Sequence, residues 1–304
     1  MTTTPTITGV YCAAATPVSA DLSPNLEAFT RHCRWLIEEG CDGVALLGTT
    51  GEANSFSSAE RRAILEAAAG SIAADKLLPG TSTSNIPEAI ELTRHAVETG
   101  VRGVVMLPPY YYKGAHDDGL FEFYARVIEG VGNPRLRVLL YHIPQVSAVP
   151  ISHDLIARLI EAFPGVVVGI KDSAGNYDNM QGIIDRFPGF AVLVGADPLL
   201  GRLMRAGGAG AITSTSNLVA RDLATVYRWA RDPAQAAEVE RAEARINAYR
   251  TLANSYVQIP TVKAMLAILT GDDGWNRPRP PMLPLNAAEL AEVRAKLAAL
   301  PAAA

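Results

Sequence analysis

One pattern limits the folds open to this chain: a short apolar run, a turn and an amphipathic helix follow one another eight times. The apolar runs have no alternating polar face, as in Gly43–Leu47 and Val166–Ile170. Strands that are apolar on both faces are typical of parallel sheets covered by helices. Eight such units within 304 residues predict an α/β protein with a (β/α)8 barrel, the TIM-barrel fold.

The predicted elements alternate up to residue 232. We expect strands at 10–14, 43–47, 77–80 (the weakest), 103–107, 137–141, 166–170, 191–194 and 209–213, with a helix after each. The remaining residues are rich in alanine and helical in pattern, broken up by Pro260, Pro278, Pro280, Pro281 and Pro284. We therefore expect a barrel of residues 1–232 and a C-terminal helical extension of residues 233–304 packed on it.

Composition narrows the functional class. A net charge of −4 without blocks of like charge argues against nucleic-acid or anionic membrane partners. No apolar run approaches the roughly 20 residues of a membrane span, and the N-terminus lacks the pattern of a signal peptide. The three cysteines are scattered and the five histidines lack metal-ligand spacing. We expect a cytoplasmic protein that acts on small molecules and uses no metal or cofactor.

In such barrels the chemistry lies at the C-terminal ends of the strands. After the second predicted strand, Gly48 and Gly51 bracket Thr49 and Thr50, followed by Glu52. Consecutive backbone N–H groups in such a turn can bind a carboxylate, although an ordinary glycine turn has the same sequence. After the fourth strand, Pro108–Tyr112 carries three tyrosines that suit a surface or an interface.

Three further strand ends carry polar residues. Tyr141 ends the fifth strand and can point into the barrel, which leaves His142 pointing away as a structural residue. Gly195-Ala196-Asp197 follows the seventh strand and Ser214-Thr215-Ser216-Asn217 follows the eighth. Turns at these two places often bind phosphate, but a carboxylate at Asp197 would repel it.

Lys171 is the most informative residue of this rim. It directly follows the apolar run Val166–Ile170, whereas most lysines lie on exposed surfaces. A desolvated ammonium loses proton affinity, and the neutral amine can attack a ketone to form a Schiff base. That chemistry needs a proton shuttle such as Tyr141, and it gains from a carboxylate site such as Gly48–Gly51.

Taken together, these motifs resemble the dihydrodipicolinate synthase / N-acetylneuraminate lyase family. The marks are Gly48–Glu52, Pro109-Tyr110-Tyr111, Tyr141-His142-Ile143-Pro144, Gly169–Asp172 and Gly195-Ala196-Asp197, in order along almost the whole chain. The resemblance implies a class I pyruvate-dependent aldolase without a cofactor, usually a homotetramer built as a dimer of dimers.

The resemblance also implies roles for individual residues. Lys171 is the Schiff-base nucleophile, Tyr141 moves protons, Thr50 is a relay hydroxyl, and Tyr111 reaches into a neighbouring subunit's site. The backbone of Gly48, Thr49 and Thr50 holds the substrate carboxylate.

At two positions that would contact the substrate, this sequence departs from the pattern of the family it resembles. Val146 stands where the synthases have an arginine for the carboxylate of the aldehyde, and Pro198 stands where sialic acid lyases have an acidic residue. A substrate pocket with Gly195, an apolar Val146, and Asp197, Ser214 and Ser216 as hydroxyl partners suits a 2-keto-3-deoxy sugar acid or a related 4-hydroxy-2-oxo acid.

We therefore expect an enzyme that cleaves a 4-hydroxy-2-oxo acid to pyruvate and an aldehyde. The same imine would also serve a dehydratase or a synthase that condenses pyruvate with an aldehyde. A barrel that only senses a 2-oxo acid, and a phosphate-binding barrel enzyme without a Schiff base, are the alternatives of other classes.

Overall fold

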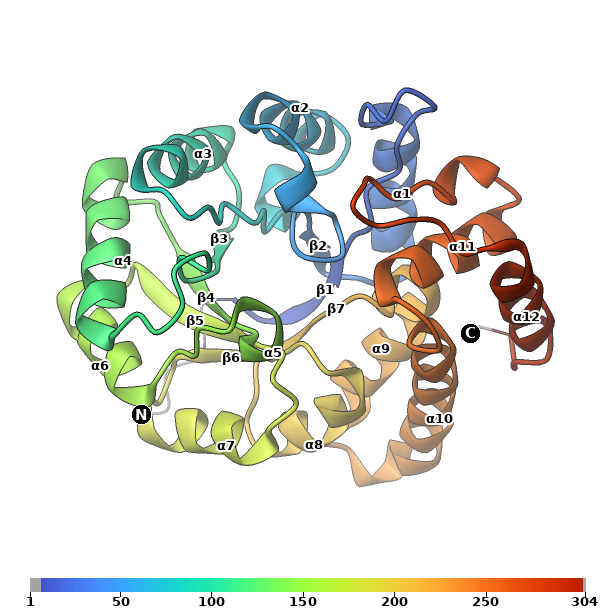
Figure 1. The fold of residues 1–304 in the computed structure, drawn as a ribbon. Helices are drawn as coiled ribbons and strands as arrows, with labels where there is room; N and C mark the ends of the chain where they lie inside the picture. The colour runs from blue at the N-terminus through green and yellow to red at the C-terminus, as the bar shows by residue number, and fades with distance from the viewer. Residues whose placement is uncertain (1–6, 303–304) are drawn as a thin grey trace.

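The computed structural model describes residues 7–302, in which parallel strands form a barrel surrounded by helices (Figure 1). The sheet has the strand order β2-β1-β7-β6-β5-β4-β3, and every pair of neighbours is parallel. The seven strands are β1 (Gly9–Ala13), β2 (Gly43–Ala45), β3 (Val104–Met106), β4 (Val138–His142), β5 (Val167–Asp172), β6 (Ala191–Val194) and β7 (Gly210–Thr213). The predicted barrel architecture is confirmed.

The third predicted strand, at 77–80, is present only as two isolated bridges. Leu77 pairs with Val44 on β2, and Gly80 pairs with Val105 on β3, so this segment links the two ends of the sheet. Pro79 has no N–H to donate, which limits how regular a ladder the segment can form. At Gly80 a side chain would lie 2.1 Å from the Leu47 carbonyl oxygen, so the close approach here requires glycine.

Helices cover the outside of the barrel, as the repeat predicts. They are α1 (Leu26–Glu38), α2 (Ser58–Ala69), α3 (Ile86–Thr99), α4 (Asp117–Val131), α6 (His153–Ala162), α7 (Tyr177–Arg186), α8 (Leu200–Arg205) and α9 (Ser216–Trp229). Several begin at side chains that accept from the backbone of the first turn, such as Ser57 before α2 and Ser152 before α6. A short helix that the apolar pattern did not predict, α5 (Pro144–Ser147), follows β4 at the rim.

The strands separate two apolar cores. The inner core fills the barrel with residues such as Tyr11, Leu139 and Ile212. The outer core lies between the strands and the helices and is much larger. Because successive residues of a strand point to opposite faces, each strand contributes to both cores, which explains why the runs have no polar face.

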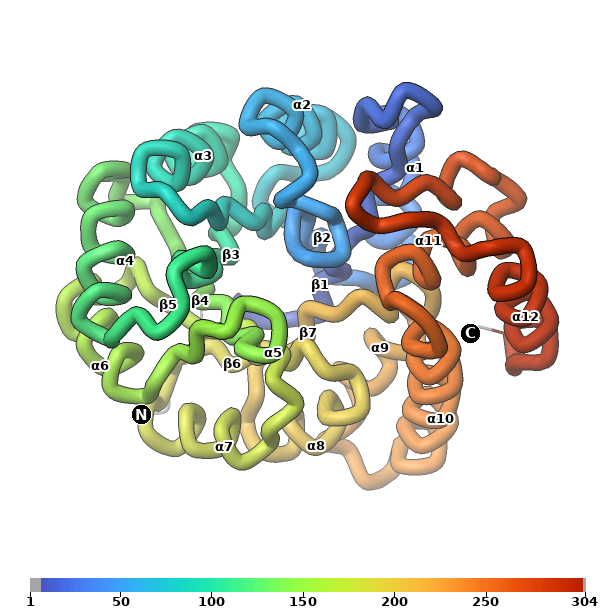
Figure 2. Tube along the Cα trace, viewed as in Figure 1, coloured from blue at the N-terminus to red at the C-terminus, as the bar shows by residue number. Residues whose placement is uncertain are grey.

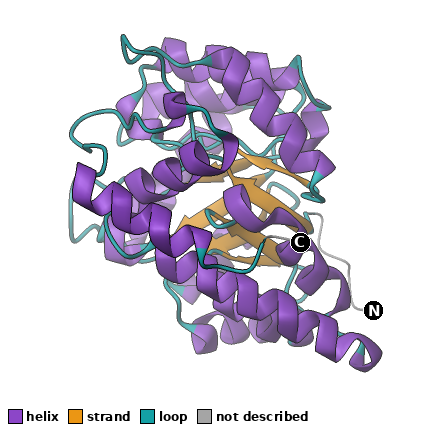
Figure 3. Cartoon of the chain, turned by 90° about the vertical axis from the view of Figure 1, so that its right-hand side faces the viewer, coloured by secondary structure: helices purple, strands orange, loops and turns teal. Residues whose placement is uncertain are grey.

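Three helices form the C-terminal part: α10 (Ala236–Ala253), α11 (Gln258–Thr270) and α12 (Ala287–Ala298). They lie on one side of the barrel (Figures 2 and 3). Of the three, α10 packs on α9. Pro260 does not interrupt them, because it lies in the first turn of α11, where the N–H has no helical partner. The division at residue 232 stays a prediction. No helix within residues 7–302 is long and apolar enough to cross a lipid bilayer.

Candidate active site

Lys171 and Tyr141 are neighbours because of the register between β4 and β5. Their Cα atoms are partners in the parallel ladder, so both side chains point to the same face, the inside of the barrel. The Lys171 Nζ lies 4.2 Å from the centroid of the Tyr141 ring. The two residues are only 5% and 4% exposed. A cation over an aromatic face is attracted to it, which holds the amine in place.

The Tyr141 hydroxyl is in a position to exchange protons. It lies 3.3 Å from Thr49 Oγ1. Burial raises the pKa of Tyr141, but the nearby Lys171 charge and the hydroxyls of Thr49 and Ser173 outweigh burial, so the pKa lies below its usual value. A phenol that gives up its proton more readily than usual suits general acid–base work.

The loop after β2 brings Thr49, rather than Thr50, to this tyrosine. Thr49 and Gly48 line the cavity, whereas Thr50 is buried and is not among the lining residues. The hydroxyl in contact with Tyr141 belongs to Thr49, so the structure favours Thr49 for the relay, and the predicted relay role of Thr50 stays a prediction. Two hydrogen bonds hold this loop. The Thr16 hydroxyl donates to the Gly51 carbonyl, and the Glu52 N–H donates to the Thr49 carbonyl.

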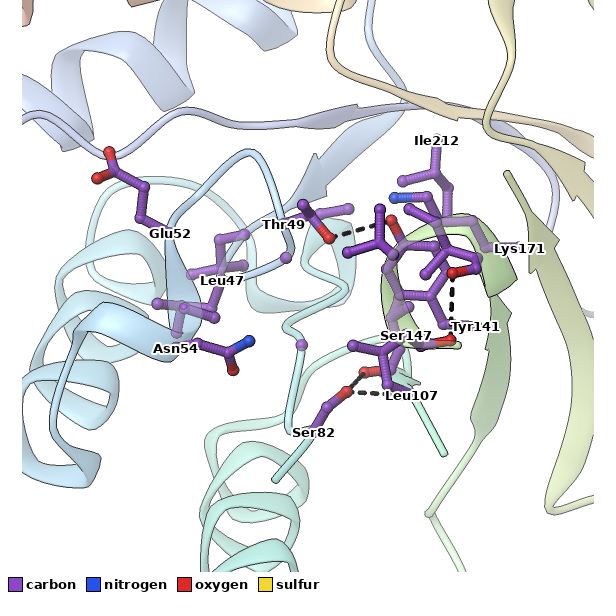
Figure 4. Close-up of a pocket in the computed structure, with 18 of the residues that line it drawn as sticks. Leu47, Thr49, Glu52, Asn54, Ser82, Leu107, Tyr141, Ser147, Lys171 and Ile212 are labelled. Carbon is purple, nitrogen blue, oxygen red and sulfur yellow. Dashed lines mark hydrogen bonds between the residues drawn. The ribbon is translucent and has the colours of Figure 1, made fainter. Parts of the chain in front are cut away.

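A cavity of about 280 Å³ opens at this rim (Figure 4). Its lining combines the Lys171–Tyr141–Thr49 cluster with mostly apolar side chains. Among the described lining residues, only Lys171 and Glu52 carry a charge. The lining also includes Asn54, Ser82, Leu107, Tyr110, Val146, Ser147, Ile212, Ile259 and Met282.

The tyrosines of the β3–α4 loop separate into two kinds. Tyr110 lines the cavity and donates a 2.9 Å hydrogen bond to Asn54 Oδ1. Tyr111 is 72% exposed and stacks edge-on against Tyr112, which is 75% exposed. Such exposure suits a residue that meets another molecule. The predicted insertion of Tyr111 into a neighbouring subunit stays a prediction.

Other predicted substrate-binding residues also lie outside the cavity lining. The Asp197 carboxylate is fully buried, paired with Arg250 of α10 and accepting from the Thr215 hydroxyl. These contacts give the Asp197 carboxylate a structural role, and its predicted role in binding a substrate hydroxyl stays a prediction. The Ser214 carbonyl accepts a 2.7 Å bond from the Asn217 side chain. At Gly195 a side chain would lie 1.9 Å from Ser173 Oγ, so this glycine makes room for Ser173.

The remaining predictions concern His142 and metal ligands. His142 Nδ1 accepts a 3.1 Å hydrogen bond from the Ile151 backbone N–H, which confirms a structural role on the outer face of β4. Within residues 7–302, no three His, Cys, Asp or Glu side chains come close enough together to hold a metal ion.

Sequence reasoning missed several lining residues. Ser82 follows the weak strand at 77–80, so the rule that rim residues follow strands could have found it. Ile259 and Met282 come from the C-terminal part, and no local signal in the sequence indicates that they reach the barrel mouth.

Comparison with known proteins shows the family of this chain. The model of the dihydrodipicolinate synthetase family matches residues 6–300. An uncharacterized DapA-like lyase of Chloroflexus aurantiacus is 33% identical over 94% of this chain and 95% of the relative.

Two solved structures share the fold over nearly their whole length. The dihydrodipicolinate synthase of Agrobacterium tumefaciens has a TM-score of 0.88 and 31% identity, covering 96% of this chain and 99% of that one. YagE of Escherichia coli, a member of the same family solved with pyruvate, has a TM-score of 0.88 and 25% identity, covering 96% and 98%. With a family match over almost all residues and the lysine–tyrosine pair at the barrel mouth, the chain belongs to the dihydrodipicolinate synthetase family.

Proposed function

We propose that this protein is a class I aldolase that cleaves a 4-hydroxy-2-oxo acid to pyruvate and an aldehyde. The observation that carries the proposal is the buried amine of Lys171, 4.2 Å from the Tyr141 ring at the mouth of the barrel. The pyruvate complex of YagE supports a 2-oxo acid as the ligand.

Lys171 and Tyr141 carry out different steps of the proposed reaction. In its neutral form the Lys171 amine bonds to C2 of the substrate. The Tyr141 hydroxyl donates the proton with which the carbonyl oxygen leaves as water, so that an iminium forms and Tyr141 becomes a phenolate. The Tyr141 oxygen, next to Thr49, takes the proton from the C4 hydroxyl. The C3–C4 bond then breaks, its electrons move to the iminium nitrogen, and the aldehyde leaves. Protonation of the enamine at C3 and addition of water at C2 release pyruvate and restore Lys171.

The lining supports a neutral tail on the substrate. Beyond Lys171, the only charged residue of the described lining is Glu52, and its carboxylate is paired with Lys263. No described lining residue offers a cation to a phosphate or second carboxylate at the far end of the substrate. Asn54 and Ser82 offer hydrogen bonds to hydroxyls, beside apolar Leu107 and Val146. A 2-keto-3-deoxy sugar acid with an uncharged polyol tail fits this description.

The assembly and compartment are part of the proposal. The exposed Tyr111–Tyr112 pair supports a homotetramer in which Tyr111 completes a neighbouring site. Cys12, Cys33 and Cys41 are buried and unpaired, which supports a reducing compartment such as the cytoplasm.

The test is reductive trapping. The protein is incubated with pyruvate and borohydride, and its peptides are mapped by mass spectrometry. We expect one adduct, on Lys171, and none in the Lys171→Ala variant, which should also lose turnover. A folded wild-type protein without an adduct would remove this mechanism and favour a sensor. If the adduct forms, a screen of keto-deoxy acids against pyruvate–aldehyde mixtures separates cleavage from dehydration and from the condensation that a synthase catalyses.

A further inference from the structure

Glu52 ends the rim motif Gly48–Glu52, but its carboxylate does not face the reacting groups. In Figure 4 it points away from Lys171 and Tyr141. Instead it pairs with Lys263 of α11, 211 residues further along the chain, and both side chains are 0% exposed. The pair therefore joins the loop after β2 to the C-terminal part of the protein.

Both charged groups of this pair have further partners. The Lys263 ammonium donates a 2.8 Å bond to the Arg277 carbonyl, and the second Glu52 oxygen accepts a 2.7 Å bond from the Arg279 backbone N–H. The Arg279 side chain donates to the Leu22 and Ser55 carbonyls and pairs with Glu60. The segment that follows α11 is thus tied to the rim loops at several points.

The loop that Glu52 holds has an unfavourable backbone conformation at both of its ends. Leu47 and Glu52, at its two ends, have φ values of 57° and 55°, in the left-handed region that favours glycine. Such residues keep this conformation only where the surroundings impose it. Glu52 N–H and Ala53 N–H donate to the carbonyls of Thr49 and Gly48, so a shift of Glu52 would move the cavity-lining turn.

Stability alone is a poor explanation for such a pair. The free energy needed to remove two charges from water is about as large as the free energy of their attraction, so a buried ion pair adds little net stability. What it provides is a defined geometry, because a carboxylate and an ammonium without water accept few alternative arrangements.

We propose that Glu52 and Lys263 are positioning residues that fix the Gly48–Glu52 loop, so that Thr49 meets Tyr141 and the loop backbone can hold the substrate carboxylate. The part of this inference that concerns substrate rests on the proposed function. The C-terminal part of the chain thereby acts on the active site through Lys263, as well as lining it with Ile259 and Met282.

The test compares two double variants. Glu52→Gln with Lys263→Met, the rim-pair variant, removes both charges while nearly keeping volume, so that the protein has no uncompensated buried charge. Asp222→Asn with Arg245→Met is the matched control. It removes another ion pair between the C-terminal part and the barrel, with Asp222 fully buried, away from the rim loop.

The first measurement is hydrogen exchange of the peptide that spans residues 48–55, which requires no assumption about the reaction. We expect exchange about tenfold faster in the rim-pair variant and unchanged in the control. The second is steady-state kinetics, well below both melting temperatures. We expect the KM for the 2-oxo acid to rise about tenfold and kcat to fall in the rim-pair variant alone.

Each result decides the inference. Wild-type exchange and KM in the rim-pair variant would overturn it, and so would equal changes in both double variants, which would indicate general loosening. If the wild-type protein does not trap pyruvate, the proposed function fails, while the exchange rates still show whether Glu52 and Lys263 hold the loop.

Discussion

The amine of Lys171 and the ring of Tyr141 share one rung of the β4–β5 ladder, 4.2 Å apart, with their Cα atoms in register. The ring therefore has two functions that can be separated: it packs against the amine, and its hydroxyl handles protons.

The Tyr141→Phe variant separates them, because it keeps the ring and removes the hydroxyl. We expect the Lys171 adduct with pyruvate to form still, and kcat for cleavage to fall roughly 10²- to 10⁴-fold, the usual contribution of a general acid–base group. Borohydride trapping and steady-state assays measure the two effects. A variant that turns over at the wild-type rate would remove Tyr141 from proton transfer.

The two threonines of the rim loop make a matched pair. Thr49 Oγ1 contacts the Tyr141 hydroxyl, whereas Thr50 is buried outside the cavity lining. Losing one hydrogen bond of about 1 to 1.5 kcal/mol should lower kcat roughly tenfold in Thr49→Val. We expect Thr50→Val to affect kcat less and to lower the melting temperature if it has any effect. The opposite ranking of kcat values would identify Thr50 as the relay.

These residues also show how far the sequence could predict the site. The C-terminal ends of parallel strands meet at one rim, so Lys171, Tyr141 and the Gly48 loop could be placed together from the order of the strands. The strand order also places Asp197 at this rim, yet its carboxylate forms an ion pair with Arg250 of α10. That contact, like the pairing of Glu52 with Lys263, depends on how the C-terminal helices pack. No local pattern encodes such packing, because the partners are separated by 53 and 211 residues.

The exposed tyrosines give a test of the assembly. Tyr111 and Tyr112 are adjacent, and they are 72% and 75% exposed, so their surroundings within one chain are similar. If Tyr111 completes a neighbouring site, Tyr111→Phe should lower kcat by about tenfold or more while Tyr112→Phe leaves it unchanged. Sedimentation at the assay concentration gives the oligomeric state. Full activity from a verified dilute monomer would contradict the role of Tyr111.

A substitution at Val146 should change which aldehyde the enzyme prefers. It lines the cavity and is 62% exposed, at the position where the resemblance places an arginine in synthases. A new cation here would be screened by water, and exposed ion pairs contribute up to about 1 kcal/mol. We expect Val146→Arg to raise kcat/KM for an aldehyde carrying a carboxylate by up to about fivefold, relative to a neutral aldehyde of equal length. Val146→Gln, which has no charge, is the control. An equal gain with both aldehydes would show that charge is not the cause.

His32 on α1 predicts how stability responds to acid. It is buried between Trp35 and Trp275, with Nε2 2.9 Å from Asn217 Oδ1. Burial lowers the pKa of His32 from 6.5 to about 4, although the Asn217 bond opposes the shift. The unfolded chain therefore binds a proton at a higher pH than the folded one does. The stability from neutral His32 is complete above pH 6.5 and is lost as the pH falls towards 4.

The linkage gives a loss of about 2 kcal/mol between about pH 7.5 and about pH 5 from this group alone. His32→Gln keeps a donor for Asn217 but does not titrate, so its free energy of unfolding should fall by about that much less over the same range. Urea unfolding of the wild type and of His32→Gln at one fixed protein concentration gives both free energies, since assembly would otherwise shift the midpoints. An unchanged pH dependence in His32→Gln would mean that His32 is protonated in the folded protein, and that its aromatic neighbours and Asn217 tolerate the charge.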